Sequence, residues 1–297
     1  NIRIRNGVDH FHCVHSMSDQ DVVALSRSLK LDIAVDLAGF TRGCRPGIFA
    51  LAAAPIQLGY IGFLGTMGAS YYDYLISDKT IIPEQNQQYY SESIVYLPSY
   101  QVNDSRNHSL GMLLERQDLG IPEGRFVYCC FNNTFKITPD IFDSWARILE
   151  QVEHSVLMLY AKNRTTESNL KKEISLRGVD PRRLVFGGYL ARPEYLARYQ
   201  LVDLFLDTTP YNGGATASDA LRMGLPVLTL AGKSFAGRLG ASLLSVLNLP
   251  ELIGTSQENY EAIAVELATD PEKINILKQR LISNLSTTRL YNTPLYT

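Results

Sequence analysis

The chain has 297 residues, and its 45% hydrophobic content is typical of a globular protein with room for two domains of about 100 to 200 residues each. Its 28 Lys and Arg residues balance 30 Asp and Glu residues to a formal net charge of −2 without any basic block, so we expect no nucleic-acid or membrane partner. No apolar run approaches the roughly 20 residues that cross a bilayer, and the first residues, NIRIRNGVDHF, are no signal peptide. We therefore expect a cytoplasmic protein, and the missing initiator Met suggests a piece of a longer chain.

The four cysteines, Cys13, Cys44, Cys129 and Cys130, show no CxxC spacing. Cys129 and Cys130 are adjacent within an apolar run, and neighbours on a strand point to opposite faces. Buried thiols in a reducing compartment are therefore favoured over a disulfide or a zinc site. No His, Cys or carboxylate cluster has metal-binding spacing, so we expect no metal and no cofactor.

The first part of the chain alternates helices with strands. The apolar periodicity predicts helices over residues 19–29 and 45–53 and strands over residues 31–40, 55–63, 74–77 and 94–97. The stretch 31–40, LDIAVDLAGF, is typical of a strand that is buried on both faces of a parallel sheet.

A polar, weakly periodic stretch over residues 101–120 marks a change in composition, and we place the domain boundary there, between domains 1–112 and 113–297. The second domain alternates strictly, with predicted strands 126–131, 155–160, 184–186, 204–206 and 227–230, intervening helices 139–151, 165–177, 192–199 and 216–223, and final helices 237–246, 259–268 and 271–283. This order predicts an α/β fold with a parallel, doubly wound sheet and right-handed crossovers. Two α/β domains in tandem would place a ligand cleft between them.

The stretch 203–230, DLFLDTTPYNGGATASDALRMGLPVLTL, carries the clearest chemical signal. It predicts a strand, a Gly-rich turn, a helix that begins near Thr216, and a second strand. Such a helix points free backbone N–H groups and the positive end of its dipole into the sheet crevice, which favours an anion site, above all for phosphate. The alternative is that Gly213 and Gly214 only allow the chain to turn.

Polar residues at other predicted strand ends would converge on the same crevice. Asn133 and Lys136 lie in the loop after the first strand of the second domain, where the lysine could meet a phosphate. Arg192 opens a helix, an unfavourable place for a cation unless an anionic ligand lies nearby, and Arg198 follows six residues later. Asp219 suits the first turn of its helix and could also accept ribose hydroxyls. For the lysine and the two arginines the alternative is an ordinary solvated surface residue.

Several motifs together are highly specific. They are AAPIQLGYIGFLGTMGA (53–69), YYSESIVYLP (89–98) followed by YQVND, CCFNNTFKITP (129–139), and the stretch 203–230. In this order they resemble the catalytic region of the O-GlcNAc transferase and SPINDLY family, from about Asp9 to the end of the chain. The resemblance implies a GT-B fold, with two Rossmann-like domains whose parallel sheets face each other across a cleft. Residues 1–112 would be the C-terminal part of the incomplete acceptor-side domain, and residues 113–297 the nucleotide-sugar-binding domain.

The implied activity is inverting, metal-independent transfer of a sugar, GlcNAc from UDP-GlcNAc, to Ser or Thr of a protein acceptor. The family normally carries tetratricopeptide repeats upstream, which this sequence lacks. The resemblance also implies site residues: Lys136 at the diphosphate, Arg198 packed on the base and Asp219 on the ribose. Further positions at the nucleotide sugar are Asn133, Leu190, Arg192, Tyr195, Gly214, Ala215 and Thr216, with Gly65 and Thr66 in a sugar-side loop. His10 is the candidate nearest to the sugar for a catalytic role.

The sequence also departs from the family pattern. The family's His-Thr-Thr is Gly214-Ala215-Thr216 here, Ala52 replaces an arginine, Tyr195 a histidine and Leu64 a proline. Each lost charge-assisted hydrogen bond would cost roughly 1.5 to 3 kcal/mol. Two alternatives therefore stay open, a non-catalytic member that binds a nucleotide or a partner, and fucosyl transfer from GDP-fucose.

Overall fold

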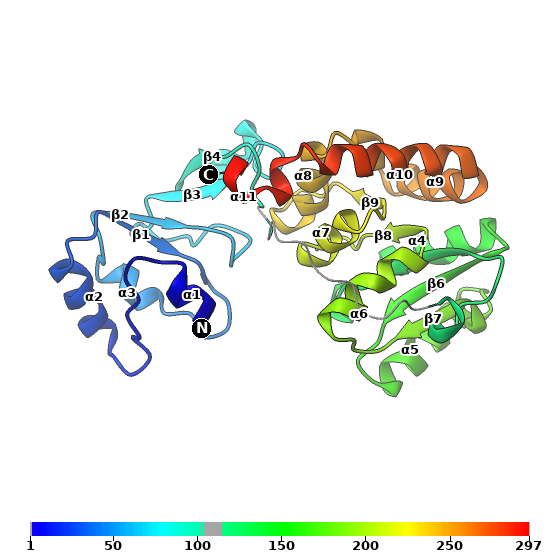
Figure 1. The fold of residues 1–297 in the computed structure, drawn as a ribbon, viewed down its shortest axis with the longest axis horizontal. Helices are drawn as coiled ribbons and strands as arrows, with labels where there is room; N and C mark the ends of the chain where they lie inside the picture. Colours follow the sequence, from blue (N-terminus) through cyan, green and yellow to red (C-terminus); the bar gives the residue numbers. More distant parts are fainter. Residues whose placement is uncertain (1, 102, 104–114, 297) are drawn as a thin grey trace. The chain divides into compact units, whose positions relative to one another are not determined.

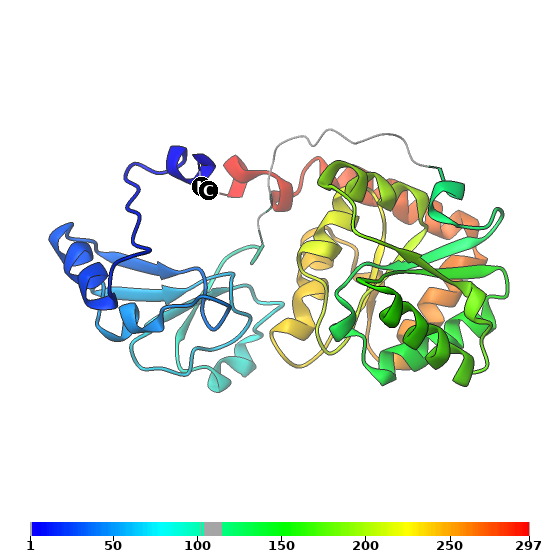
Figure 2. The same ribbon diagram turned by 90° about the horizontal axis from the view of Figure 1, so that it is seen from below.

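The computed structural model describes residues 2–101, 103 and 115–296 (Figures 1 and 2). The chain divides into two compact units, of which the first comprises Asn1–Ser77 and Pro83–Leu97 and the second Asp78–Ile82 and Pro98–Thr297. The predicted boundary at residues 112 and 113 lies outside the described residues. None of the described helices is long and apolar enough to span a membrane.

The first unit is built on a four-stranded parallel sheet with the order β1-β2-β3-β4. Its strands are β1 (Ile33–Asp36), β2 (Ile56–Gly59), β3 (Tyr74–Ser77) and β4 (Ser93–Tyr96), and its helices are α1 (Ile2–Asn6), α2 (Asp19–Ser28) and α3 (Pro46–Ala50). A capping box between Ser18 and Asp21 starts α2. The predicted elements are confirmed: β3 has the predicted bounds, β4 is displaced by one residue, and β1 and β2 are shorter at both ends than the apolar runs suggested.

The expectation that the first strand is buried on both faces was wrong. In β1 the side chains of Ile33 and Val35 are 53% and 45% exposed. β1 is an edge strand of the described sheet and pairs only with β2. Apolar side chains allow a strand to be buried, but they do not determine whether another part of the protein packs against it.

The second unit contains a six-stranded parallel sheet with the order β10-β9-β8-β5-β6-β7. Its strands are β5 (Phe126–Cys130), β6 (Ser155–Tyr160), β7 (Leu184–Gly187), β8 (Leu204–Leu206), β9 (Val227–Leu230) and β10 (Ile253–Gly254). Its helices are α4 (Pro139–Gln151), α5 (Arg164–Leu176), α6 (Arg192–Ala197), α7 (Ala215–Arg222), α8 (Leu239–Val246), α9 (Gln257–Thr269), α10 (Pro271–Leu285) and α11 (Thr293–Tyr296). The predicted parallel α/β sheet is confirmed, with the two-residue β10 as an addition. The strand order reverses between β5 and β8, which are neighbours, and such a switch point is the usual ligand site of a doubly wound sheet.

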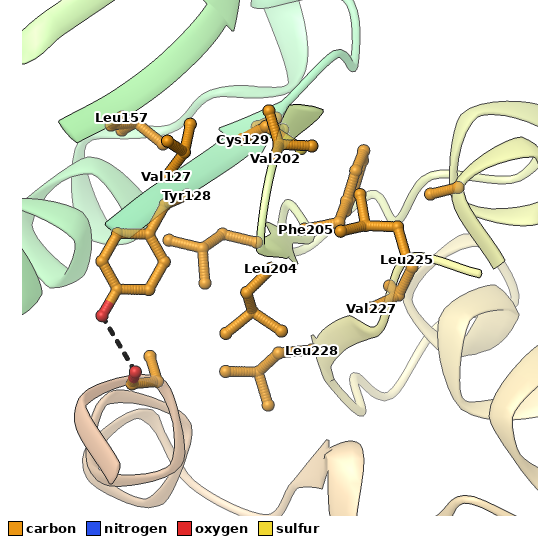
Figure 3. Packing of buried hydrophobic residues seen from close by; sticks show 14 of the residues in the cluster. Val127, Tyr128, Cys129, Leu157, Val202, Leu204, Phe205, Leu225, Val227 and Leu228 are labelled. Carbon is orange, nitrogen blue, oxygen red and sulfur yellow. Dashed lines mark hydrogen bonds between the residues drawn. The ribbon is translucent and has the colours of Figure 1, made fainter. Parts of the chain in front are cut away.

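The core of the second unit lies where the central strands meet the flanking helices (Figure 3). Residues of β5, β8 and β9, among them Val127, Leu204 and Val227, are fully buried. The Tyr128 hydroxyl donates 2.9 Å to the carbonyl of Ala264 and so ties β5 to α9. Because β5 and β8 pair in parallel, with Cys129 opposite Phe205, their carboxyl ends lie side by side.

The cysteines divide into two kinds, and none forms a disulfide. Cys129 and Cys130 are buried in β5, as expected, and burial raises the pKa of both thiols. The expectation of burial was wrong for Cys13, which is exposed, and Cys44 is half-buried. Both lie in loops of the first unit, where no apolar run surrounds them.

Candidate functional site

A buried polar cluster occupies the switch point of the second sheet. Asp207 follows β8, and its Oδ1 accepts hydrogen bonds from the backbone N–H groups of Thr208 (2.9 Å) and Gly213 (2.7 Å). Asn132 follows β5 and donates from Nδ2 to Asp207 Oδ1 at 3.1 Å, while Thr229 of β9 donates to Oδ2 at 2.8 Å. Burial raises the pKa of Asp207 to about 6, although these four donors favour the ionised form. The carboxylate thus organises the turn that leads into α7.

The N-terminus of α7 opens directly above this cluster. Gly214 is the N-cap and supplies no side-chain cap, so the first-turn N–H groups of Ala215, Thr216 and Ala217 have no acceptor within the helix. Gly214 has φ −94°, so it does not use the left-handed conformation that favours glycine. The arrangement is the one that binds anions at helix N-termini.

Lys136 brings a cation to the same turn. It closes a 3-10 turn (Thr134–Lys136), and its Nζ donates 2.8 Å to the carbonyl of Asn212 and lies 3.9 Å from the centre of the Tyr211 ring. The side chain is half-buried, and burial lowers the pKa of its ammonium. The interpretation of Lys136 as a plain exposed loop lysine is therefore wrong. Asn133, by contrast, has an exposed side chain.

A pocket of about 320 Å³ lies beside the start of α6. Its lining is largely aromatic and apolar with two arginines, and consists of Phe131, Tyr160, Gly188, Tyr189, Leu190, Arg192, Tyr195, Arg198 and Thr216. A nucleoside base with its ribose is of a size to enter such a space, and aromatic walls suit the faces of a base.

Arg198 lines this pocket and is 1% exposed. Its guanidinium carbon is 3.7 Å from the centre of the Phe131 ring, and Nη1 makes one long hydrogen bond, 3.4 Å, to the carbonyl of Gly188. Within the described part of the chain, Nε of Arg198 has no hydrogen-bond partner. Burial lowers the pKa of this guanidinium. A buried cation with so few partners is costly, which favours a ligand that completes its contacts.

Arg192 and Asp219 meet at the rim of the pocket. Arg192 Nη1 and Nη2 donate to the two oxygens of Asp219 at 2.6 and 2.7 Å, and this pairing raises the pKa of the guanidinium. The ion pair explains how a cation is tolerated at the first position of α6. It also holds the Asp219 carboxylate in one orientation.

Two tyrosines support the first turn of α7 from the pocket side. The Tyr199 hydroxyl donates 3.1 Å to the carbonyl of Thr216, and the hydroxyls of Tyr195 and Tyr199 are 2.6 Å apart. Because Tyr199 has one hydroxyl hydrogen, Tyr195 is the donor in the second bond. The Tyr195 hydroxyl is therefore available to a ligand only as an acceptor.

The remaining predicted residues belong to the first unit. His10 is exposed in the segment between α1 and α2. Thr66 donates to Glu92 Oε2 at 2.5 Å and accepts from the N–H of Gly68 at 2.9 Å, so its hydroxyl hydrogen is used toward the residue that precedes β4. Gly65, beside it, is half-buried.

The structure brings the predicted residues of the second unit to one region, around the pocket and the N-terminus of α7. Sequence reasoning missed several residues of this region, namely Phe131, Asn132, Tyr160, Tyr189, Tyr199 and Asp207. The position of Asn132 and Asp207 directly after two adjacent parallel strands is the signal that could have found them.

Comparison with known proteins gives a consistent result. The model of the family Glycosyl transferase family 41 matches residues 2–111 and 103–297. The Arabidopsis thaliana protein named "Probable UDP-N-acetylglucosamine--peptide N-acetylglucosaminyltransferase SEC" is 36% identical over 98% of this chain and 30% of its own length. A Solanum lycopersicum protein of the same description, SPINDLY, is 31% identical over 90% of this chain and 29% of its own length.

Solved structures agree with the sequence relatives. A mutant, K341M, of the Thermobaculum terrenum O-GlcNAc transferase superposes with a TM-score of 0.90 at 32% identity, covering 96% of this chain and 54% of that one. The S. aureus protein TarM, with a TM-score of 0.60 and 13% identity over 92% of this chain and 56% of its own, shares the fold alone. The fold is that of the GT-B glycosyltransferases, as predicted.

The chain spans about 30% of the length of the curated relatives that it matches. The family model nevertheless covers nearly every residue of the chain, and the predicted resemblance to the O-GlcNAc transferases and SPINDLY proteins is confirmed. The chain belongs to glycosyl transferase family 41.

Proposed function

We propose that this chain is part of the catalytic region of a protein O-GlcNAc transferase, which moves GlcNAc from UDP-GlcNAc to a Ser or Thr hydroxyl of a protein acceptor, and that its second unit binds the donor. The observation that carries the proposal is the meeting of an anion-binding helix terminus, a half-buried lysine and an aromatic pocket at one switch point. The names of the similar Arabidopsis thaliana and Thermobaculum terrenum proteins supply the donor and the reaction.

The donor's parts match the chemistry of this region. The uracil occupies the aromatic pocket, which Arg198 and Phe131 line. The ribose hydroxyls donate to the Asp219 carboxylate, which Arg192 orients. The diphosphate meets the first-turn N–H groups of α7 and the ammonium of Lys136.

The same groups promote the reaction by stabilising charge. Breaking the bond between sugar and phosphate leaves negative charge on UDP, and fixed N–H dipoles with a nearby cation stabilise that charge without a metal ion. Binding energy of this kind acts in the transition state, so it raises turnover as well as affinity. In the first unit, the proposal assigns Gly65 and Thr66 to the sugar-side loop and His10 to the neighbourhood of the reacting sugar. The division into an acceptor-side domain, 1–112, and a donor domain, 113–297, and a cytoplasmic location belong to the same proposal.

The test is calorimetry and transfer with the full-length protein. UDP should bind more tightly than GDP, and UDP-GlcNAc should label Ser or Thr of an acceptor peptide while GDP-fucose should not. Transfer of fucose from GDP-fucose would show that GDP-fucose, and not UDP-GlcNAc, is the donor. Tight UDP binding without transfer would instead identify a binding protein, an outcome that the missing side chains at Gly214 and Ala215 would explain.

A further inference from the structure

The Thr216 hydroxyl faces into the protein. Its Oγ1 lies within hydrogen-bond reach of Asn132 Oδ1, and a carbonyl-type oxygen can only accept, so the single hydroxyl hydrogen of Thr216 is used in this bond. The hydroxyl therefore has no hydrogen left to donate to a diphosphate.

The orientation of the Asn132 amide follows from its other contacts. Nδ2 lies 3.1 Å from Asp207 Oδ1 and 2.8 Å from Thr208 Oγ1. Because the Thr208 hydroxyl donates 2.6 Å to the carbonyl of Tyr211, it accepts from Asn132. Both contacts require a donor, so Nδ2 faces Asp207 and Oδ1 faces Thr216. Asn132 is 1% exposed, which excludes competing water from this chain of bonds.

Two glycines make room for the cluster. A Cβ at Gly213 would lie 2.7 Å from Thr216 Oγ1 and 2.8 Å from Asn132 Oδ1, closer than non-bonded atoms approach. A Cβ at Gly240, in α8, would lie 2.7 Å from Asp207 Oδ2. The backbone therefore closes around the cluster on two sides, and the space admits no larger residue without a shift.

We propose that Asn132 and Asp207 are positioning residues for the diphosphate site, and that the Thr216 hydroxyl is a strut against Asn132 rather than a ligand of the phosphates. This inference rests on the proposed function of the site. We call the chain of hydrogen bonds from Asp207 through Asn132 to Thr216 the strut. It connects the end of β8 to the first turn of α7. It aims the N–H groups of that turn, which make the phosphate contacts.

A double-mutant cycle with Asn132→Ala and Thr216→Val tests the strut. Each single variant of the full-length protein should weaken UDP binding about tenfold and uridine binding less than about twofold, because only the phosphates meet the α7 terminus. The double variant should lose no more than the worse single variant, since both remove the same bond. Thr216→Ser keeps the hydroxyl and should restore UDP affinity.

A ligand role for Thr216 gives a different pattern. In that case Asn132→Ala would free the hydroxyl and leave UDP affinity unchanged or improved, or the two losses would add, and either result overturns the strut. Equal losses for UDP and uridine would also overturn it, because they indicate a general structural effect.

Amide hydrogen exchange measures how well the strut holds the turn before α7 in the absence of nucleotide. Asn132→Ala should speed exchange of the Gly213 N–H, which donates to Asp207, about tenfold or more, and unchanged exchange would overturn the proposal. Failure of UDP to bind the unaltered protein would count against the proposed function alone. If Asn132→Ala does not fold, Asn132→Ser perturbs the same contacts more gently and takes its place.

Discussion

Arg192 and Asp219, 27 residues apart, form a two-bonded ion pair at the rim of the aromatic pocket, with N–O distances of 2.6 and 2.7 Å. The pair joins the first residue of α6 to α7. Side-chain exposures of 49% for Arg192 and 14% for Asp219 leave the carboxylate mostly shielded, with the arginine as its outer cover. The pair thus fixes the group that the proposed function assigns to ribose.

The first prediction concerns this pair. Arg192→Met removes the two donors but keeps an apolar stem, so Asp219 becomes mobile, and uridine and UDP should both bind about three- to tenfold more weakly by calorimetry. The melting temperature should change little, because the arginine is half exposed. Arg182→Met is a matched control, since Arg182 makes a similar pair with Asp180 at a 90% exposed site, and it should leave affinity unchanged. Tighter binding in Arg192→Met would mean that the pair competes with the ligand.

The second prediction concerns Lys136. Lys136→Met keeps the stem over Tyr211 and removes the charge, so UDP affinity should fall about tenfold while uridine affinity is retained. The variant also loses the bond to the Asn212 carbonyl, and we expect a small decrease in unfolding free energy, about 0.5 to 1.5 kcal/mol. Chemical denaturation measures the second effect. Equal loss of uridine and UDP affinity would argue against a phosphate contact.

The third prediction concerns Arg198. Arg198→Met replaces a buried cation that has few polar contacts with an apolar side chain of similar length, so thermal stability should stay the same or rise. Uridine affinity should nevertheless fall, because the base loses a planar cation beside its ring. Thermal melting and calorimetry on the same sample measure both effects. A clear loss of stability would show that the arginine is a structural residue.

Much of the fold could be predicted from the sequence because its signals are local. The central strands of the second unit are continuous apolar runs between turn residues, and the helices carry caps such as Thr138 before α4. The two-residue β10 has no such pattern and was missed. The burial of β1 was mispredicted because it depends on what covers the strand.

The site was predicted only in outline because its side-chain contacts join segments that are far apart in the sequence. Asn133 was chosen as a candidate, although its neighbour Asn132 is the buried one, and what distinguishes Asn132 is its set of contacts with residues 75 or more positions away, such as Asp207. Likewise, Arg192 and Asp219 were both predicted as ligand residues, but no spacing rule reveals that they bind each other. Side-chain pairing across a sheet edge is set by strand order, which local periodicity does not contain.

The fourth prediction concerns the pH dependence of stability. Burial raises the pKa of Asp207 from 3.8 to about 6, so between these values the folded protein holds a proton that the unfolded chain releases. The contribution of Asp207 to the unfolding free energy therefore falls as pH rises through this window, by about 3 kcal/mol at 1.4 kcal/mol per pKa unit.

Asp207→Asn removes this titration, so the difference in unfolding free energy, variant minus wild type, should increase between pH 4 and pH 6. Urea denaturation at several pH values measures the difference. The charged neighbour Lys136 is present in both proteins, and burial raises the pKa of Cys130 away from the window, so neither interferes. A difference that stays constant with pH would show that the buried carboxylate keeps its ordinary pKa.

The last prediction concerns the altered loop at Gly214 and Ala215, whose side chains cannot contact a phosphate. The double change Gly214→His with Ala215→Thr adds an imidazole and a hydroxyl at the N-terminus of α7, where donors act on the charge of the departing phosphate. One such donor is typically worth about 10² to 10³ in rate.

The backbone permits this change. Gly214 has φ −94°, and among the described residues a Cβ there would meet the Gln101 amide nitrogen at 3.2 Å and a Leu239 methyl at 3.7 Å, so one flexible side chain must yield. We therefore expect a folded double variant whose turnover of UDP-GlcNAc rises more than its affinity for UDP, because a donor aimed at developing charge favours the transition state over the ground state. Gly214→Ala with Ala215→Val is the control for bulk without either donor, and it should change turnover far less. If the double variant binds UDP more tightly but transfers no sugar, the missing catalytic group lies elsewhere, and the arginine that Ala52 replaces is the next position to restore.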